Sequence, residues 1–161
     1  VRFSCEDTQF LIQQNVKAVV VACNTSTAHA LDDLRRRSPV PVIGVIEPGA
    51  KAAVAASRSG RIGVIGTAGT IASGAYERAI KARRPDAIVI SQACPLFVPL
   101  IEEGWFDHPA TELIAREYLA PLQDALPAQI ADEQARRGGG DLQARGQLVD
   151  GFAQVAAHAV K

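Results

Sequence analysis

The run from Val19 to Thr27 places a reactive side chain directly before several polar ones. An aliphatic stretch ends at Cys23, and small polar residues follow it at once. Ligands of open parallel sheets bind at the carboxyl ends of strands, and a helix that begins there lowers the pKa of a thiol. We therefore expect Cys23 to act as a base or nucleophile. The residues after it, Asn24, Thr25 and Ser26, could hold a carboxylate or phosphate.

A second polar turn, Gly66-Thr67-Ala68-Gly69-Thr70, follows another aliphatic run. Its two hydroxyls and a helix terminus suit an anion, but it fits neither the G-x-G-x-x-G pattern nor a P-loop. A structural alternative stays open for both turns. In that interpretation Thr70 merely caps a helix, the polar residues after Cys23 do the same, and Cys23 itself is a small buried hydrophobe.

A third stretch, Gln92 to Gly104, also follows a predicted strand. Cys94 precedes a proline, so it lacks the free N–H groups of a regular helix start, and packing is its expected role. Glu102 and Glu103 lie on an otherwise apolar segment. One of them could be a buried acid that orients a catalytic group, although a solvated surface carboxylate is the commoner case.

Short β-branched runs alternate with helical stretches, which predicts an α/β fold of βαβ units with a parallel sheet. The predicted strands are Ala18–Ala22, Val42–Ile46, Gly63–Ile65 and Ala87–Ile90, and the predicted helices are 3–15, 27–37, 50–57, 71–83 and 110–122. Because the strands are continuous apolar runs, we expect both of their faces to be buried. The identical tetrads at 43–46 and 62–65 indicate either a structural repeat or chance.

The composition excludes several classes of protein. The 161 residues carry 17 Lys and Arg against 17 Asp and Glu, so no basic face for nucleic acid is expected. The longest apolar run, Ala18 to Cys23, is too short to span a membrane. The three cysteines and three histidines show no metal-ligand spacing and no disulfide framework, which predicts no metal and a reduced, cytoplasmic compartment.

Five segments together resemble the glutamate racemases, cofactor-independent enzymes that supply D-glutamate for peptidoglycan. The segments are Val20–Thr25, Pro41–Gly49, Ile62–Ile71, Ala93–Glu102 and Glu117–Leu122. The resemblance implies two similar α/β domains with the substrate between them. Residues 1–57 would form part of the first domain and residues 58–122 part of the second, followed by a divergent, helical or irregular tail at 123–161.

The resemblance also implies the chemistry of individual residues. In such a family two acid–base groups act on opposite faces of the amino acid, one thiolate removing the α-proton and one thiol donating a proton. Cys23 matches one of these groups, and Glu102 matches an acid near the second catalytic face. Cys94 matches a cysteine that is not catalytic. The residues that match substrate binders are Asn24, Thr25, Thr67 and Thr70. No cofactor is implied.

Other family motifs are missing from these 161 residues. An Asp-Ser-Gly strand end, a Pro-Tyr-Gly turn and the Gly-Cys-Thr-His motif of the second catalytic cysteine do not occur. We expect a gene product truncated at the N-terminus and divergent after about residue 122. The missing strands predict unpaired edges, exposed apolar surface and self-association into a homo-oligomer.

The predicted function is the interconversion of L- and D-glutamate. The main alternative is a non-catalytic remnant that binds a small dicarboxylate or associates with an intact racemase. A related racemase of aspartate or a hydantoin is a further alternative, which the run Pro95–Leu100 disfavours.

Overall fold

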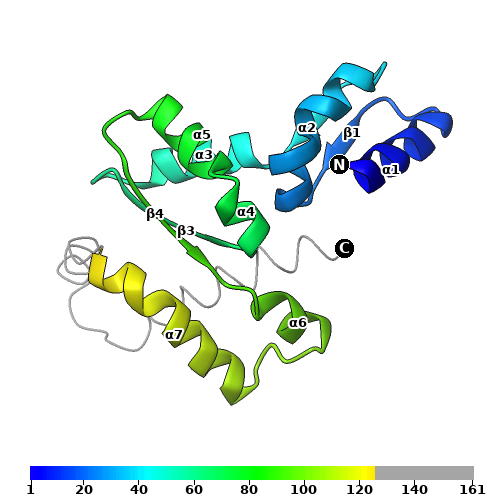
Figure 1. The fold of residues 1–161 in the computed structure, drawn as a ribbon. Coiled ribbons are helices and arrows are strands. Elements are labelled where there is room, and N and C mark those ends of the chain that lie inside the picture. Colours follow the sequence, from blue (N-terminus) through cyan, green and yellow to red (C-terminus); the bar gives the residue numbers. More distant parts are fainter. Residues whose placement is uncertain (126–161) are drawn as a thin grey trace.

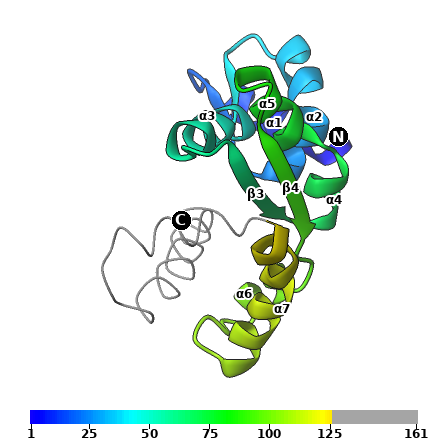
Figure 2. The same ribbon diagram turned by 90° about the vertical axis from the view of Figure 1, so that its left-hand side faces the viewer.

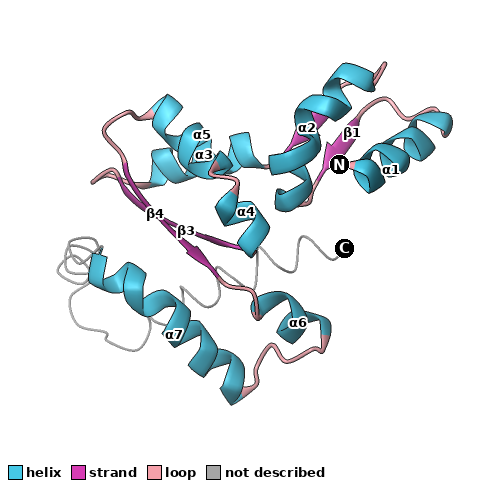
Figure 3. Cartoon of the chain, in the orientation of Figure 1, coloured by secondary structure: helices cyan, strands magenta, loops and turns pink. Residues whose placement is uncertain are grey.

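The computed structural model describes residues 1–125, which form helices and short parallel strands (Figure 3). The helices are α1 (Arg2–Gln13), α2 (Asn24–Arg37), α3 (Ile46–Ala56), α4 (Ala68–Ala72), α5 (Ala75–Arg83), α6 (Phe97–Glu102) and α7 (Pro109–Ala125). The strands are β1 (Val19–Val21), β2 (Val42–Gly44), β3 (Arg61–Gly66) and β4 (Ile88–Ala93). The predicted α/β class is confirmed. The tail predicted at 123–161 lies outside the described residues from residue 126 onward.

The strands pair in two separate parallel sheets, one of β1 and β2 and one of β3 and β4. Val19 pairs with Val42 in the first sheet, and Arg61 pairs with Ile88 in the second. Helix α2 connects the strands of the first sheet, and α4 and α5 connect those of the second. These are the βαβ units that the alternating sequence pattern predicts.

Each sheet has its own hydrophobic core. The first core packs β1 and β2 against one face of α2, formed by Ala30, Leu31 and Leu34, whose spacing is that of a helical stripe. The second core joins β3 and α5 to α3, which contributes Ile46 and Ala50. The chain therefore passes from one core to the other near Val45, whereas the division into domains at residue 57 stays a prediction.

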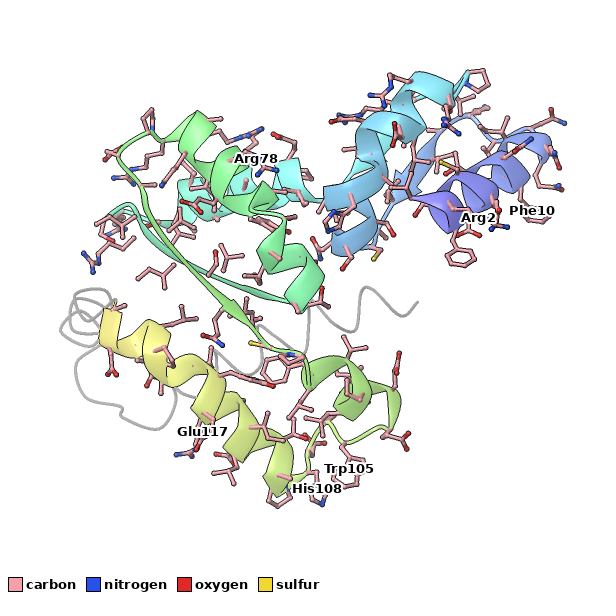
Figure 4. All side chains as sticks on the ribbon, viewed as in Figure 1. Arg2, Phe10, Arg78, Trp105, His108 and Glu117 are labelled. Carbon is pink, nitrogen blue, oxygen red and sulfur yellow. The ribbon has the colours of Figure 1, made fainter. Side chains whose placement is uncertain are left out.

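Helix α7 lies on the other side of the second sheet from α3 and α5 (Figure 1). The guanidinium of Arg61 on β3 donates to the carbonyl oxygen of Ala125 at the end of this helix. In the connection between α6 and α7, Trp105 and His108 stack with ring centroids 4.3 Å apart (Figure 4). No helix among residues 1–125 has the length and apolar character needed to cross a membrane.

The expected burial of both strand faces is wrong for β1 and β2. Burial alternates along β1 and β2, and the register pairs Val20 with Ile43 on the open face, where they are 61% and 49% exposed. Helix α2 covers only the opposite face. The apolar runs thus predicted the strands correctly, but they wrongly implied a second layer that covers the other face. The exposed apolar surface that the sequence predicts is present on that face.

Several predicted element boundaries also need correction. Helix α2 begins at Asn24 and not at residue 27, α3 begins at Ile46 and not at residue 50, and β4 ends at Ala93 and not at Ile90. The strand predicted at Val42–Ile46 ends at Gly44, and Ile46 begins α3. The helix predicted at 71–83 is two helices, α4 and α5, separated by Gly74 with a φ of 63°. A positive φ cannot continue a right-handed helix, and glycine adopts it without steric cost.

Gly44 lies where helix α2 approaches β2 closely. A Cβ atom at Gly44 would lie 2.6 Å from Thr27 Cγ2 and 2.7 Å from Leu31 Cδ2. Thr27 cannot easily move away, because its hydroxyl donates to the Val21 carbonyl over 2.9 Å. We expect Gly44→Ala to lower the free energy of unfolding, measured with urea, by about 1–3 kcal/mol.

Gly66→Ala is the matched control for this substitution. A Cβ atom at Gly66 would meet its nearest neighbours, in Thr70, at 3.5 Å, which is ordinary van der Waals contact. Its unfolding free energy is expected to change by less than about 0.5 kcal/mol. Equal losses in the two variants would contradict the close packing of α2 on β2.

Candidate functional site

The N-terminal ends of α2 and α4 meet at a cluster of three hydroxyl groups. Thr25 Oγ1 lies 2.9 Å from Thr67 Oγ1 and 2.9 Å from Thr70 Oγ1, and the last two oxygens are 3.0 Å apart. Thr25 follows β1 and the other two follow β3, so the two sheets direct the carboxyl ends of these strands toward one place (Figure 1). The structure therefore brings together three of the four predicted substrate-binding residues.

The hydroxyl groups of Thr25, Thr67 and Thr70 form a hydroxyl triangle, in which each group has one proton to donate. Three hydroxyls supply three protons, and the closed triangle uses all of them in its three hydrogen bonds. An anionic ligand needs donors, so at least one hydroxyl must turn away from the triangle to bind it. In the closed triangle, the hydroxyls of Thr67 and Thr70 are hydrogen-bonded to Thr25 and so join α4 to α2.

Thr67, not Thr70, caps α4. The Thr67 hydroxyl accepts a hydrogen bond from the Thr70 backbone N–H over 3.3 Å, and its backbone is extended, as is usual at an N-cap. The structural expectation of a capped turn at this position is met, but the capping residue was misassigned. Thr70 is instead almost fully buried, and its hydroxyl is one corner of the triangle.

Cys23 is the N-cap of α2 and is exposed. Its Sγ accepts a hydrogen bond from the Ser26 backbone N–H over 3.4 Å. Partial burial opposes ionisation of the thiol, but the hydrogen bonds of Ser26 and Thr25 outweigh it and lower the pKa of Cys23 below its ordinary value. An accessible thiol with a lowered pKa can remove a proton or attack an electrophile.

Asn24 begins α2 and is linked to α5. Its Oδ1 accepts a hydrogen bond of 2.7 Å from the hydroxyl of Tyr76. Burial raises the pKa of Tyr76, so the phenol stays protonated and remains a donor. Sequence reasoning missed Tyr76, because no local pattern links a helix N-terminus to a tyrosine so distant in the chain.

His29 supplies a further contact between the two helices. It is exposed, and its Nε2 lies 3.1 Å from the Gly69 carbonyl oxygen of α4. Among residues 1–125, no group of three His, Cys, Asp or Glu side chains is arranged to hold a metal ion.

The other candidate residues lie apart from this cluster. Glu102 is exposed at the end of α6, which both views place away from α2 (Figures 1 and 2). It has the solvated position that is common for surface carboxylates, and its catalytic role stays a prediction. Cys94 is buried just after β4, and this burial raises the pKa of its thiol, in keeping with a packing role.

The opposite pKa directions of Cys23 and Cys94 predict the order in which the cysteines react. We expect iodoacetamide to modify Cys23 first and Cys94 last in the folded protein, since the thiolate is the nucleophile. The rate at Cys23 should rise with pH, with a midpoint below the ordinary pKa of a cysteine thiol. Peptide mass spectrometry over a pH series measures both. A midpoint above that value would contradict the helix-end stabilisation of the thiolate.

The chain matches the family model of the Asp/Glu/hydantoin racemases over residues 5–131. A glutamate racemase of Geobacter metallireducens is 54% identical to it over 124 residues, which are 77% of this chain and 46% of that protein. A glutamate racemase of Aquifex aeolicus is 52% identical over 130 residues, 81% of this chain and 50% of that protein. The chain thus spans about half the length of the curated relatives it matches.

Solved structures give the same result. A glutamate racemase of Bacillus anthracis matches with a TM-score of 0.72 and 42% identity, over 76% of this chain and 46% of that one. A glutamate racemase of Francisella tularensis, solved in complex with D-glutamate, matches with a TM-score of 0.71 and 40% identity, over the same shares of the two chains.

Proposed function

Because the chain belongs to the Asp/Glu/hydantoin racemase family, we propose that it acts as a glutamate racemase, with Cys23 as the acid–base group on one face of the substrate. The observation that carries this proposal is an exposed thiol of lowered pKa at the start of α2, next to the hydroxyl triangle. The similarity to proteins named glutamate racemases supports glutamate as the substrate.

The proposed reaction uses these groups as follows. The Cys23 thiolate removes the α-proton of glutamate, so the Cα–H bond breaks, an S–H bond forms and the electron pair is delocalised into the carboxylate. Inversion of the α-carbon then requires return of a proton on the opposite face by a second acid–base group, a role that this proposal assigns to no residue among 1–125. In this proposal Thr25, Thr67 and Asn24 hold the charged groups of the amino acid. Thr70 contributes the third hydroxyl, which contacts those of Thr25 and Thr67. The reaction needs no cofactor.

The same proposal sets the biological context. Glutamate is the small-molecule substrate bound at the site, and D-glutamate produced in the cytoplasm would serve peptidoglycan synthesis. The open apolar face that carries Val20 and Ile43 supports self-association into a homo-oligomer.

A second candidate is a non-catalytic protein that binds a small dicarboxylate. The position of Glu102, exposed on α6 and away from α2, favours it, because the proposed second catalytic face then lacks its acid among the described residues. This candidate keeps the hydroxyl triangle as a binding site and assigns no proton transfer to Cys23.

A panel of amino acids tests the proposal. Incubation with the separate enantiomers of glutamate and aspartate, followed by chiral chromatography, is expected to show inversion of glutamate and none of aspartate. Turnover of aspartate with inert glutamate would contradict the assigned substrate. Binding of glutamate without inversion would favour the second candidate.

A further inference from the structure

The hydrogen bond between Tyr76 and Asn24 fixes the direction of an amide group at the site. Asn24 lies on α2, which packs in the first core, whereas Tyr76 lies on α5 and packs against the second core. The 2.7 Å bond between the Tyr76 hydroxyl and Asn24 Oδ1 therefore joins α5 of the second core to α2 of the first core. Asn24 directly follows Cys23 in the chain.

The ring of Tyr76 is held where this bond requires it. A Cβ atom at Gly49 of α3 would lie 3.0 Å from the Tyr76 hydroxyl oxygen and 3.2 Å from its Cε1. The absence of a side chain at Gly49 thus leaves the space that the ring fills. Tyr76 is half-buried there and stays a neutral donor at ordinary pH.

The bond also decides which end of the Asn24 amide is left for a ligand. An asparagine amide has an acceptor oxygen and a donor nitrogen, which diverge from the same carbon. With Oδ1 turned to Tyr76, the Nδ2 group points away from it, and within residues 1–125 Nδ2 donates to no protein acceptor. A reversed amide would instead present its oxygen and repel an anion.

We propose that Tyr76 is a positioning residue that orients the Asn24 amide so that its Nδ2–H group donates to a carboxylate of the bound amino acid. This inference rests on the proposed function of the site and adds to it a residue outside the segments that match substrate binders. Tyr76 acts through Asn24 and does not itself touch the ligand.

A double-mutant cycle on D-glutamate binding tests this role. The dissociation constant is measured by titration calorimetry for the parent protein, Tyr76→Phe, Asn24→Ala and the double variant. Tyr76→Phe keeps the ring and removes only the hydroxyl, so it is expected to weaken binding about 5- to 10-fold in the parent. In the Asn24→Ala background the same substitution should change binding less than about 2-fold, because the amide that it orients is gone.

Two controls accompany the cycle. Tyr118→Phe removes a phenol hydroxyl on α7 that accepts a hydrogen bond from the Leu96 backbone N–H over 3.3 Å. Both views place α7 away from α2 (Figures 1 and 2), so this variant should leave binding unchanged. In ligand-free protein, the ¹H–¹⁵N signal of the Asn24 amide group is identified by its loss in Asn24→Ala. Tyr76→Phe should shift that signal.

Each outcome is decisive. A loss confined to proteins that keep Asn24 supports the positioning role, as does the shifted amide signal. An equal loss in both backgrounds, an unchanged dissociation constant in Tyr76→Phe or an unmoved signal overturns it and leaves Tyr76 a packing residue. Failure of the parent protein to bind glutamate at all is a different result, which contradicts the proposed function and, with it, this inference.

Discussion

Cys23→Ser is expected to reduce exchange of the α-proton of glutamate by about 10²- to 10⁴-fold, the usual contribution of a positioned acid–base group. Serine is nearly isosteric with cysteine and can still accept the N–H of Ser26 as a helix cap. Its hydroxyl, however, does not ionise near neutral pH, whereas the thiol of Cys23 has a lowered pKa. The substitution therefore removes the base and leaves the local structure in place.

Cys5→Ser is the matched control. Cys5 lies on α1 and packs at the edge of the first core, so losing its thiol should leave the exchange rate unchanged. Solvent deuterium uptake at the α-carbon, followed by NMR, measures the rate for both variants. Exchange that survives in Cys23→Ser at the parental rate would show that another group removes the proton.

Thr25→Val is expected to weaken glutamate binding about 10- to 100-fold, the cost of a lost hydrogen bond to a charged group. Thr25 takes part in two of the three bonds of the hydroxyl triangle, and it is the one member that comes from α2. Valine keeps the shape of the side chain but supplies no donor. It also removes the two hydrogen bonds through which Thr25 joins α2 to Thr67 and Thr70.

Thr111→Val removes a comparable hydroxyl from a different part of the fold. Thr111 lies on α7, where it donates to the Trp105 carbonyl oxygen over 2.7 Å. Calorimetric titration with D-glutamate should give the parental dissociation constant for this variant. If the two threonine variants bind glutamate equally well, the triangle is not the carboxylate site.

Local sequence patterns were sufficient to find the turns that build the site. An aliphatic run followed by small polar residues predicts a buried strand that ends at a helix N-terminus, and both turns have this form, with Cys23 and Thr67 as the N-caps. The meeting of Thr25 with Thr67 and Thr70 follows less directly. The resemblance implied that all three bind one ligand, and only the packing of α2 against α4 shows their contact.

The identical tetrads show where local pattern fails. Ile62–Ile65 lies entirely within β3, whereas Ile43-Gly44-Val45-Ile46 leaves β2 after its second residue and enters α3. They are therefore not structurally equivalent. Pro48 follows Ile46, the first residue of α3, by two positions and is tolerated in the first turn of a helix, where a backbone N–H has no partner within the helix. Tertiary packing of Ile46 in the second core decides the boundary.

The Tyr76–Asn24 bond was also beyond sequence reasoning, as was the position of the exposed apolar surface on one face of β1 and β2. The first joins residues 52 positions apart that share no motif. The second depends on which elements cover a sheet, because a continuous apolar run is the same whether one face or both are buried.

Proton transfer by Cys23 is tested most directly by incubating the folded protein with L- and D-glutamate separately in D₂O. Deuterium at the α-carbon and the enantiomer of the recovered glutamate are measured together by NMR and chiral chromatography. We predict deuterium at the α-carbon of glutamate started from either enantiomer, with the inverted product carrying it, and loss of both in Cys23→Ser. Recovered glutamate that has bound to the protein but carries no α-deuterium would contradict proton transfer by Cys23.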